Sequence, residues 1–196
     1  MLRDGPVGAR DAKVRKELRD WLRRLHDEIP VTTVCVTHDQ EEALTLSDRI
    51  AIINQGKLVQ LGQPERVYEQ QETVFAARFL GDANVFTGTV VAQGLQLATG
   101  EIVRSATGQS PTVIVRPEKM EVAAAGTPVA PGLNQITGQI LQVVFSGASV
   151  TYRIKTAALG AEPLLVFAQN RAAAPLARGS AGTIAWAPQD TVAVSQ

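Results

Sequence analysis

Residues 36–50 read VTHDQEEALTLSDRI, and this stretch holds one of the two histidines of the chain. The residues over 31–37 are mostly β-branched and include no glycine or proline, which predicts a buried strand. Asp39, followed three positions later by Glu42, predicts an N-cap with a reciprocal acidic partner and hence a helix. His38 is therefore expected at the carboxyl end of a strand, where open α/β sheets bind ligands. A histidine that only caps a strand or bonds a loop is the alternative, and position alone does not separate the two.

A long amphipathic helix is predicted to precede this strand. Apolar residues recur at helical spacing over 12–29, and charged residues fill the opposite face. Asp11 is the expected N-cap, and Pro30 is expected to end the helix. A helix followed directly by a strand is typical of an α/β unit, not of a helical bundle.

A hairpin and a further helix are predicted after the histidine region. Short apolar strands over 49–53 and 57–61 flank an Asn-Gln-Gly turn. The following Gly-Gln-Pro-Glu places a proline in a first helical turn, and apolar positions continue to Gly81. The first predicted domain is thus an α/β unit over residues 1–81.

Residues 82–196 show a different pattern, of short strands separated by glycines, and form the second predicted domain. It is expected to be a small closed or half-closed all-β barrel, with a surface loop over 123–132. Its aromatic residues are expected in the core: Phe86, Phe145, Tyr152, Phe167 and Trp186. The candidate strands lie over 86–91, 95–97, 112–115, 136–144, 149–154, 164–167, 183–186 and 191–194.

Composition narrows the classes of function. The chain has 196 residues, 45% of them hydrophobic, with 19 basic and 19 acidic side chains, so it has no overall basic field to attract nucleic acid. Cys35 is the only cysteine and is expected in the buried strand, so a reducing cytoplasm is the simplest compartment. No apolar run is long enough to cross a bilayer, and direct membrane insertion is not expected.

Several longer runs resemble one protein family. The run VTHDQEEALTLSDRI resembles the switch-histidine region of ATP-binding cassette (ABC) ATPases of the importer type, and INQGKLVQLGQPERVYEQ resembles the hairpin and helix that follow it. FLGDANVFTG and the Arg-Pro-Glu of VIVRPEKMEV are similar to the appended oligonucleotide/oligosaccharide-binding-like barrel, the TOBE domain. The overall match most resembles the spermidine and putrescine importers, with iron, phosphonate and sulfate importers close behind.

The resemblance implies a function and a set of site residues. In the intact family, two ATPase subunits bind ATP and Mg²⁺ between them as a homodimer and drive membrane permease subunits from the cytoplasmic face. His38 carries the switch-histidine role, which positions the attacking water at the γ-phosphate. Asp4 would be the Walker B aspartate of the magnesium site, and Asp11 the D-loop aspartate. Gly5 stands where the catalytic glutamate is expected, and glycine cannot act as a general base.

The sequence also departs from the family. No G-x-x-x-x-G-K-[ST] loop and no LSGGQ-like signature occur in these 196 residues. The chain is therefore expected to be the C-terminal part of a transporter ATPase that neither binds ATP tightly nor hydrolyses it alone. The alternative is a non-catalytic dimerising or ligand-sensing module built on the barrel. A nucleic-acid-binding barrel is disfavoured by the lack of a basic aromatic groove, and a metal enzyme by the lack of His and Cys after residue 81.

Overall fold

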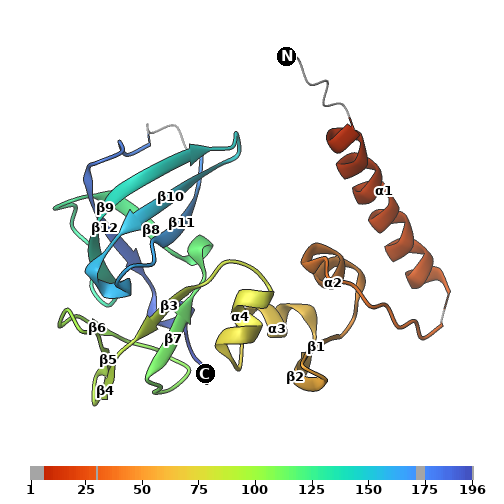
Figure 1. The fold of residues 1–196 in the computed structure, drawn as a ribbon, viewed down its shortest axis with the longest axis horizontal. Helices are drawn as coiled ribbons and strands as arrows, with labels where there is room; N and C mark the ends of the chain where they lie inside the picture. Colours follow the sequence, from red (N-terminus) through yellow and green to blue (C-terminus); the bar gives the residue numbers. More distant parts are fainter. Residues whose placement is uncertain (1–6, 30, 171–174, 196) are drawn as a thin grey trace. The chain divides into compact units, whose positions relative to one another are not determined.

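The computed structural model describes residues 7–29, 31–170 and 175–195, and within the first helix the side chains of 7–13 and 15 are not described. The chain forms two compact units, which divide between Glu69 and Gln70 (Figure 1). This division falls earlier in the chain than the predicted domain boundary after Gly81. The N-terminal unit contains α1 (Val7–Glu28), α2 (Gln40–Leu46), β1 (Ile50–Asn54), β2 (Lys57–Gly62) and α3 (Pro64–Glu69).

The predicted amphipathic helix is present as α1, but it begins earlier than expected, at Val7. Asp11 lies inside the helix, so the prediction that it forms the N-cap is wrong. Residues 7–11 contain no proline, so nothing in the local sequence prevents the helix from extending N-terminal to Asp11 as far as Val7. Pro30 lies outside the described residues.

The predicted buried strand over 31–37 is wrong, because this segment has no regular secondary structure. Val34 is 86% exposed and Val36 is 94% exposed, and Cys35 is exposed instead of buried. A strand requires a neighbour for its backbone hydrogen bonds. In the described part of the N-terminal unit, the only paired strands are β1 and β2, which pair with each other.

The predicted hairpin is confirmed, with β1 and β2 pairing antiparallel. Gln55 and Gly56 both have positive φ, 49° and 74°, the pattern that matches the twist of a two-residue hairpin turn. The single helix expected from Pro64 to Gly81 is instead two short helices, α3 and α4 (Val74–Phe79). The side chain of Thr73 caps α4 by accepting a hydrogen bond from the Ala76 N–H at 3.0 Å, which explains where the second helix begins.

The second unit begins with α4 and continues as a β-rich body. Its strands form a five-stranded sheet in the order β11-β10-β9-β12-β8 and two three-stranded sheets, β13-β7-β3 and β4-β5-β6 (Figure 1). All predicted strands are present within a few residues, and the 86–91 strand is divided into β3 and β4. Two strands, β6 and β8, were not predicted. The bounds are β3 (Asn84–Thr87), β4 (Thr89–Val91), β5 (Gly94–Gln96), β6 (Ile102–Val103), β7 (Thr112–Val115), β8 (Glu121–Ala124), β9 (Asn134–Phe145), β10 (Ser149–Lys155), β11 (Leu164–Gln169), β12 (Ala181–Trp186) and β13 (Thr191–Ala193), with 3-10 turns at Pro117–Lys119, Ala157–Leu159 and Pro188–Asp190.

One apolar core lies between the sheets of the second unit. Phe86 and Trp186 stack at its centre with ring centroids 5.4 Å apart. Every residue of β7 is buried: Val113 and Val115 face this core, while Ile114 packs with Ala77 of α4 in a smaller second cluster. Burial on both faces explains why β7 is a continuous apolar run instead of an alternating one.

The aromatic residues confirm most of the predicted core. Tyr152 is buried with Phe86 and Trp186, and Phe167 is partly buried. Phe145 is 62% exposed at the end of β9, so its predicted core position is wrong. Strand β12 pairs with β9 only over residues 134–139, whereas Phe145 at the far end pairs with Val150 of β10 alone among the described strands.

The predicted closed barrel is not found, because strand pairing in the described residues of the second unit leaves three separate sheets. Two buried asparagines link segments that no strand ladder joins. Asn84 of β3 donates from Nδ2 to the Leu165 carbonyl and accepts from the Leu165 N–H, both at 2.8 Å. Asn134 of β9 binds the N–H and C=O of Arg104 in the same way, at 2.9 and 2.8 Å. An amide side chain thus replaces a backbone pair at each gap.

No helix in the described part of the chain is both long and apolar enough to cross a membrane.

Candidate functional site

His38 lies in the N-terminal unit, on an exposed turn between α1 and α2. It precedes Asp39, which caps α2 as predicted: one carboxylate oxygen accepts hydrogen bonds from the N–H groups of Glu41 at 2.9 Å and Glu42 at 3.2 Å. The cap fixes the backbone on the helical side of the histidine.

The Glu42 carboxylate does not make the predicted direct bond to the capping residue Asp39 but reaches it through Thr37. The Thr37 hydroxyl accepts from the Asp39 N–H at 2.9 Å and donates to Glu42 Oε2 at 2.8 Å. Thr37 and Asp39, the two neighbours of His38, are therefore both tied to the first turn of α2. The sequence does not predict this pair of hydrogen bonds, because its β-branched pattern places Thr37 in a strand.

His38, Asp39, Gln40 and Glu41 line a shallow, open depression. Two of these four side chains are carboxylates: Asp39 would repel a phosphate placed there, whereas the charge of Glu41 is offset by Arg19 at 2.8 Å. The four lining residues therefore supply an imidazole but no cationic side chain.

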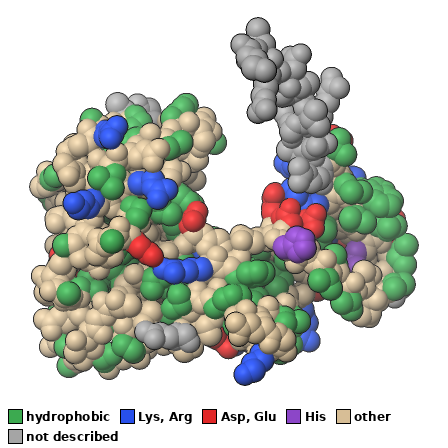
Figure 2. Space-filling view, in the orientation of Figure 1, with side chains coloured by type: hydrophobic (Ala, Val, Ile, Leu, Met, Phe, Trp, Pro, Cys, Tyr) green, Lys and Arg blue, Asp and Glu red, His purple; other side chains and the backbone are tan. Residues whose placement is uncertain are grey.

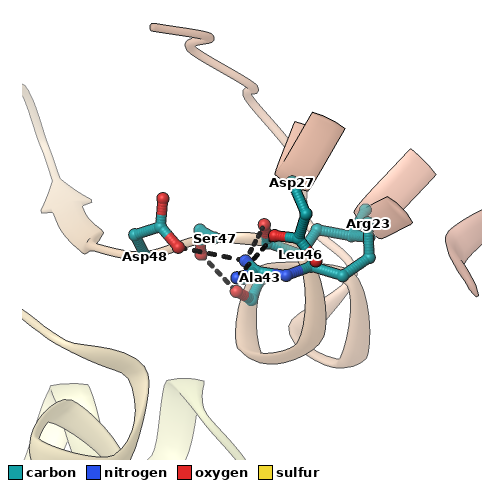
Figure 3. A network of polar contacts seen from close by, with 6 residues as sticks. All are labelled: Arg23, Asp27, Ala43, Leu46, Ser47 and Asp48. Atoms are coloured by element: carbon teal, nitrogen blue, oxygen red, sulfur yellow. Dashed lines mark hydrogen bonds and ion pairs between the residues drawn. The ribbon is translucent and has the colours of Figure 1, made fainter. Parts of the chain in front are cut away.

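Two arginines of α1 contact α2. Arg19 pairs with Glu41 at 2.8 Å, and Arg23 pairs with Asp48 at 3.0 Å and donates to the Leu46 carbonyl at 3.2 Å. Figure 3 shows the Arg23 side chain directed into the turn that ends α2, beside Asp27, to which it pairs at 3.2 Å. The helical pattern of the sequence placed these arginines on the polar face of α1 but did not identify their partners.

Neither of the two predicted aspartates has a described side chain. Asp4 and Gly5 lie outside the described residues. Asp11 lies within α1, and its side chain is not described. Among the residues whose side chains are described, no group of three or more His, Cys, Asp or Glu could hold a metal ion.

The N-terminal unit also exposes apolar side chains, visible in green in Figure 2. On α1, Val14, Leu18 and Trp21 are 50–59% exposed. The sequence predicts such a face where further sheet strands and helices would pack. The packing of α1 within this unit therefore leaves its apolar stripe accessible to solvent.

In the second unit, the Arg-Pro-Glu segment has a structural role. Arg116 is buried, and its guanidinium donates to the carbonyls of Ala77 and Asp82, both at 2.9 Å. Pro117 begins a 3-10 turn. A nearby depression of about 430 Å³ is bordered by Arg78 and Glu162, which pair with each other at 3.0 Å. The opposite charges at its border neutralise one another and favour no particular ligand.

Comparison with known proteins gives one family match. Residues 113–194 match the family described as the TOBE domain. These residues span β7 to β13, the larger part of the second unit.

Curated relatives extend the similarity into the N-terminal unit. The sulfate/thiosulfate import ATP-binding protein CysA of Halalkalibacterium halodurans is 52% identical over 129 residues, covering 63% of this chain and 36% of the relative. CysA of Burkholderia pseudomallei is 44% identical over 167 residues, 84% of this chain and 46% of the relative. The spermidine/putrescine import ATP-binding protein PotA of Rubrobacter xylanophilus is 38% identical over 200 residues, 95% of this chain and 51% of the relative.

The chain spans about half or less of the length of these relatives. Among solved structures, the cytoplasmic molybdate-binding protein ModG with molybdate bound is similar at a TM-score of 0.46 and 14% identity, over 56% of this chain and 93% of that one. Similarity this low does not bear on what the chain binds. The matches together make the chain similar to the C-terminal region of ABC importer ATP-binding subunits that carry a TOBE domain.

Proposed function

We propose that this chain acts as the C-terminal part of the ATP-binding subunit of an ABC importer and supplies His38 to its nucleotide site. The observation that carries the proposal is the geometry at His38: an exposed imidazole held on a capped turn, within a sequence similar to import ATP-binding proteins. In such a subunit the imidazole holds the attacking water and the γ-phosphate in line. Positioning and electrostatic stabilisation supply most of the catalysis in phosphoryl transfer.

The remainder of the nucleotide site has to come from residues that this sequence does not contain. A phosphate-cradling loop, with its lysine, would provide the positive charge that Asp39 and Glu41 do not. Asp4 would hold the magnesium shell and Asp11 would act across the homodimer interface, as the resemblance implies. The permease subunits would then place the assembly on the cytoplasmic face of the membrane.

For the solute, we propose sulfate or thiosulfate ahead of a polyamine. The CysA relatives are up to 52% identical to this chain, whereas the PotA relatives are 38–40% identical. These identities therefore do not single out the polyamine subtype that the sequence predicts. Because the chain alone is not expected to hydrolyse ATP, the test is binding: the chain is expected to co-purify with reconstituted sulfate permease subunits and not with polyamine permease subunits.

The first prediction concerns the chain alone. Because the 196 residues contain no phosphate-cradling loop, isothermal titration with millimolar Mg-ATP is expected to show no binding. Binding that is lost in His38→Ala would contradict this and would mean that the chain contains a nucleotide site of its own. Binding that persists in the variant would place a site elsewhere.

The second prediction tests the proposed function. The part of the Halalkalibacterium halodurans CysA that precedes its matched segment is joined to the full 196-residue chain carrying Gly5→Glu, because glycine cannot supply the general base, and Mg-ATP hydrolysis is measured. His38→Ala is expected to lower turnover by about 100-fold, the usual cost of removing one transition-state stabiliser. His26→Ala, the matched control on α1, should leave the rate unchanged.

A fusion that hydrolyses ATP equally well without His38 would refute the role proposed for this histidine. The alternative, a dimerising or ligand-sensing module, requires no nucleotide. It would be favoured if the chain associates with itself or binds a solute in the same way with and without His38.

A further inference from the structure

Helix α2, which follows His38, has no fully buried residue. Its apolar residues Ala43, Leu44 and Leu46 are half-buried, and the helix lies against α1 and α3. A helix this short does not persist in water on propensity alone. Its cap and its polar contacts with α1 therefore add to this partial packing in setting its orientation.

Those contacts reach both ends of α2. Arg19 and Arg23 are four residues apart on α1, so they project from the same side of the helix. Arg19 reaches Glu41 in the first turn of α2, and Arg23 reaches the carbonyl of Leu46, its last residue, and Asp48 just beyond. Contacts at both ends resist rotation of α2, which a single contact would allow.

The two contacts differ in environment. The Arg19 side chain is only 12% exposed, although its partner Glu41 is 67% exposed, so the pair is partly shielded from solvent. Arg23 is more exposed, but Asp27, one turn along α1, pairs with it at 3.2 Å and holds its guanidinium toward the C-terminal end of α2 (Figure 3). A cation at this end also complements the helix dipole.

The orientation of α2 is transmitted to His38 through its two neighbours. The Asp39 carboxylate is bonded to the first turn of the helix, and the Thr37 hydroxyl bridges the Asp39 N–H and the Glu42 carboxylate. The backbone on either side of His38 therefore moves with α2.

We propose that Arg19 and Arg23 are positioning residues for His38: by holding α2 at both ends, they set the direction in which the imidazole faces. The inference rests on the function proposed for His38 in ATP hydrolysis. Neither arginine contacts nucleotide in this scheme, so losing them should lower the turnover number and leave the KM for ATP largely unchanged.

The first experiment needs no ATPase activity and uses the full chain. Backbone order parameters of residues 40–46 and the ring signals of His38 are measured by NMR, with the two histidines told apart by His26→Ala. In Arg19→Gln/Arg23→Gln the order parameters are expected to fall from about 0.85 to below about 0.6, and the His38 signals to shift. Arg24→Gln, on the same helix, is the control and should change neither.

A second variant guards against loss of folding. In Arg19→Glu/Glu41→Arg the charges are exchanged, and the order of α2 should return toward that of the parent chain, while Arg19→Glu alone disorders it. The amide signals of the β1–β2 hairpin should be unchanged in every variant. If α2 stays ordered when both arginines are replaced by glutamine, the proposal that Arg19 and Arg23 hold α2 is overturned.

The second experiment repeats these variants in the CysA fusion. The double glutamine variant should lower the turnover number about 10-fold, and Arg19→Lys/Arg23→Lys should recover most of it. If the glutamine variant turns over normally while His38→Ala fails, the positioning role is overturned and the proposed function stands. If His38→Ala turns over normally, the proposed function fails, and the NMR result alone decides whether the arginines hold α2.

Discussion

Replacing Trp186 with alanine is expected to destabilise the second unit by about 3–5 kcal/mol, the range found for deleting a large buried aromatic side chain. Trp186 is buried, stacks on Phe86 with centroids 5.4 Å apart, and donates from Nε1 to the Thr191 hydroxyl at 2.9 Å. Its loss removes apolar contacts from the centre of the core and leaves that hydroxyl with one donor fewer.

Urea unfolding of the full chain, followed by circular dichroism in the β region, measures the effect. Trp186→Phe keeps most of the packing and loses the hydrogen bond, so it should cost about 1 kcal/mol from that bond in addition to a small packing loss. Phe145→Ala is the control, because that ring is largely exposed, and it should be within about 0.5 kcal/mol of the parent. A loss below 1 kcal/mol in Trp186→Ala would show that the core does not depend on this ring.

The second large effect is expected at Arg116. Arg116 is 4% exposed, and its guanidinium donates to the carbonyls of Ala77, in α4, and Asp82, in the segment that follows α4. Hydrogen bonds from charged groups are each worth about 1.5–3 kcal/mol, so Arg116→Met should destabilise the second unit by about 3 kcal/mol. The loss should be concentrated where α4 joins the β-rich body.

Amide hydrogen exchange separates this local effect from general unfolding. In Arg116→Met, amides of α4 should exchange faster than those of β9 and β12 relative to the parent chain. Arg153→Met, at an exposed position of β10, provides the comparison and should be close to neutral. If amide exchange became equally faster in α4, β9 and β12, Arg116 would not act only on α4. It would instead stabilise the whole core of the second unit.

Local pattern was sufficient for most of the second unit. The strands over 112–115, 149–154 and 164–167 agree with the sequence prediction within two residues, because runs of β-branched and apolar residues between polar breaks are visible in short windows of sequence. The two missed strands have weak signals: β6 has two residues, and half of β8 is alanine. Closure of the barrel could not be predicted in the same way, because it depends on which strands lie next to each other. In this structure Asn84 and Asn134 join segments that no strand ladder pairs.

At the candidate site, the sequence located His38 and the cap formed by Asp39 but misassigned the segment before them. Residues 31–37 have the composition of a strand, yet a strand forms only when its backbone finds a partner, and composition cannot supply one. The contacts of Arg19 and Arg23 could not be predicted from the sequence for a similar reason. Their partners lie more than twenty residues away, and only packing brings them together.

The sequence by itself determined the helical and strand periods, the Gln55–Gly56 turn, the cap of α2 and the resemblance that points to His38, because each depends on residues within a few positions of one another. Only the tertiary structure decided that β7 is buried on both faces, that two asparagine side chains join segments no strand ladder pairs, and that two arginines of α1 contact α2. These are contacts between distant segments, and their free energy exists only once the chain has folded.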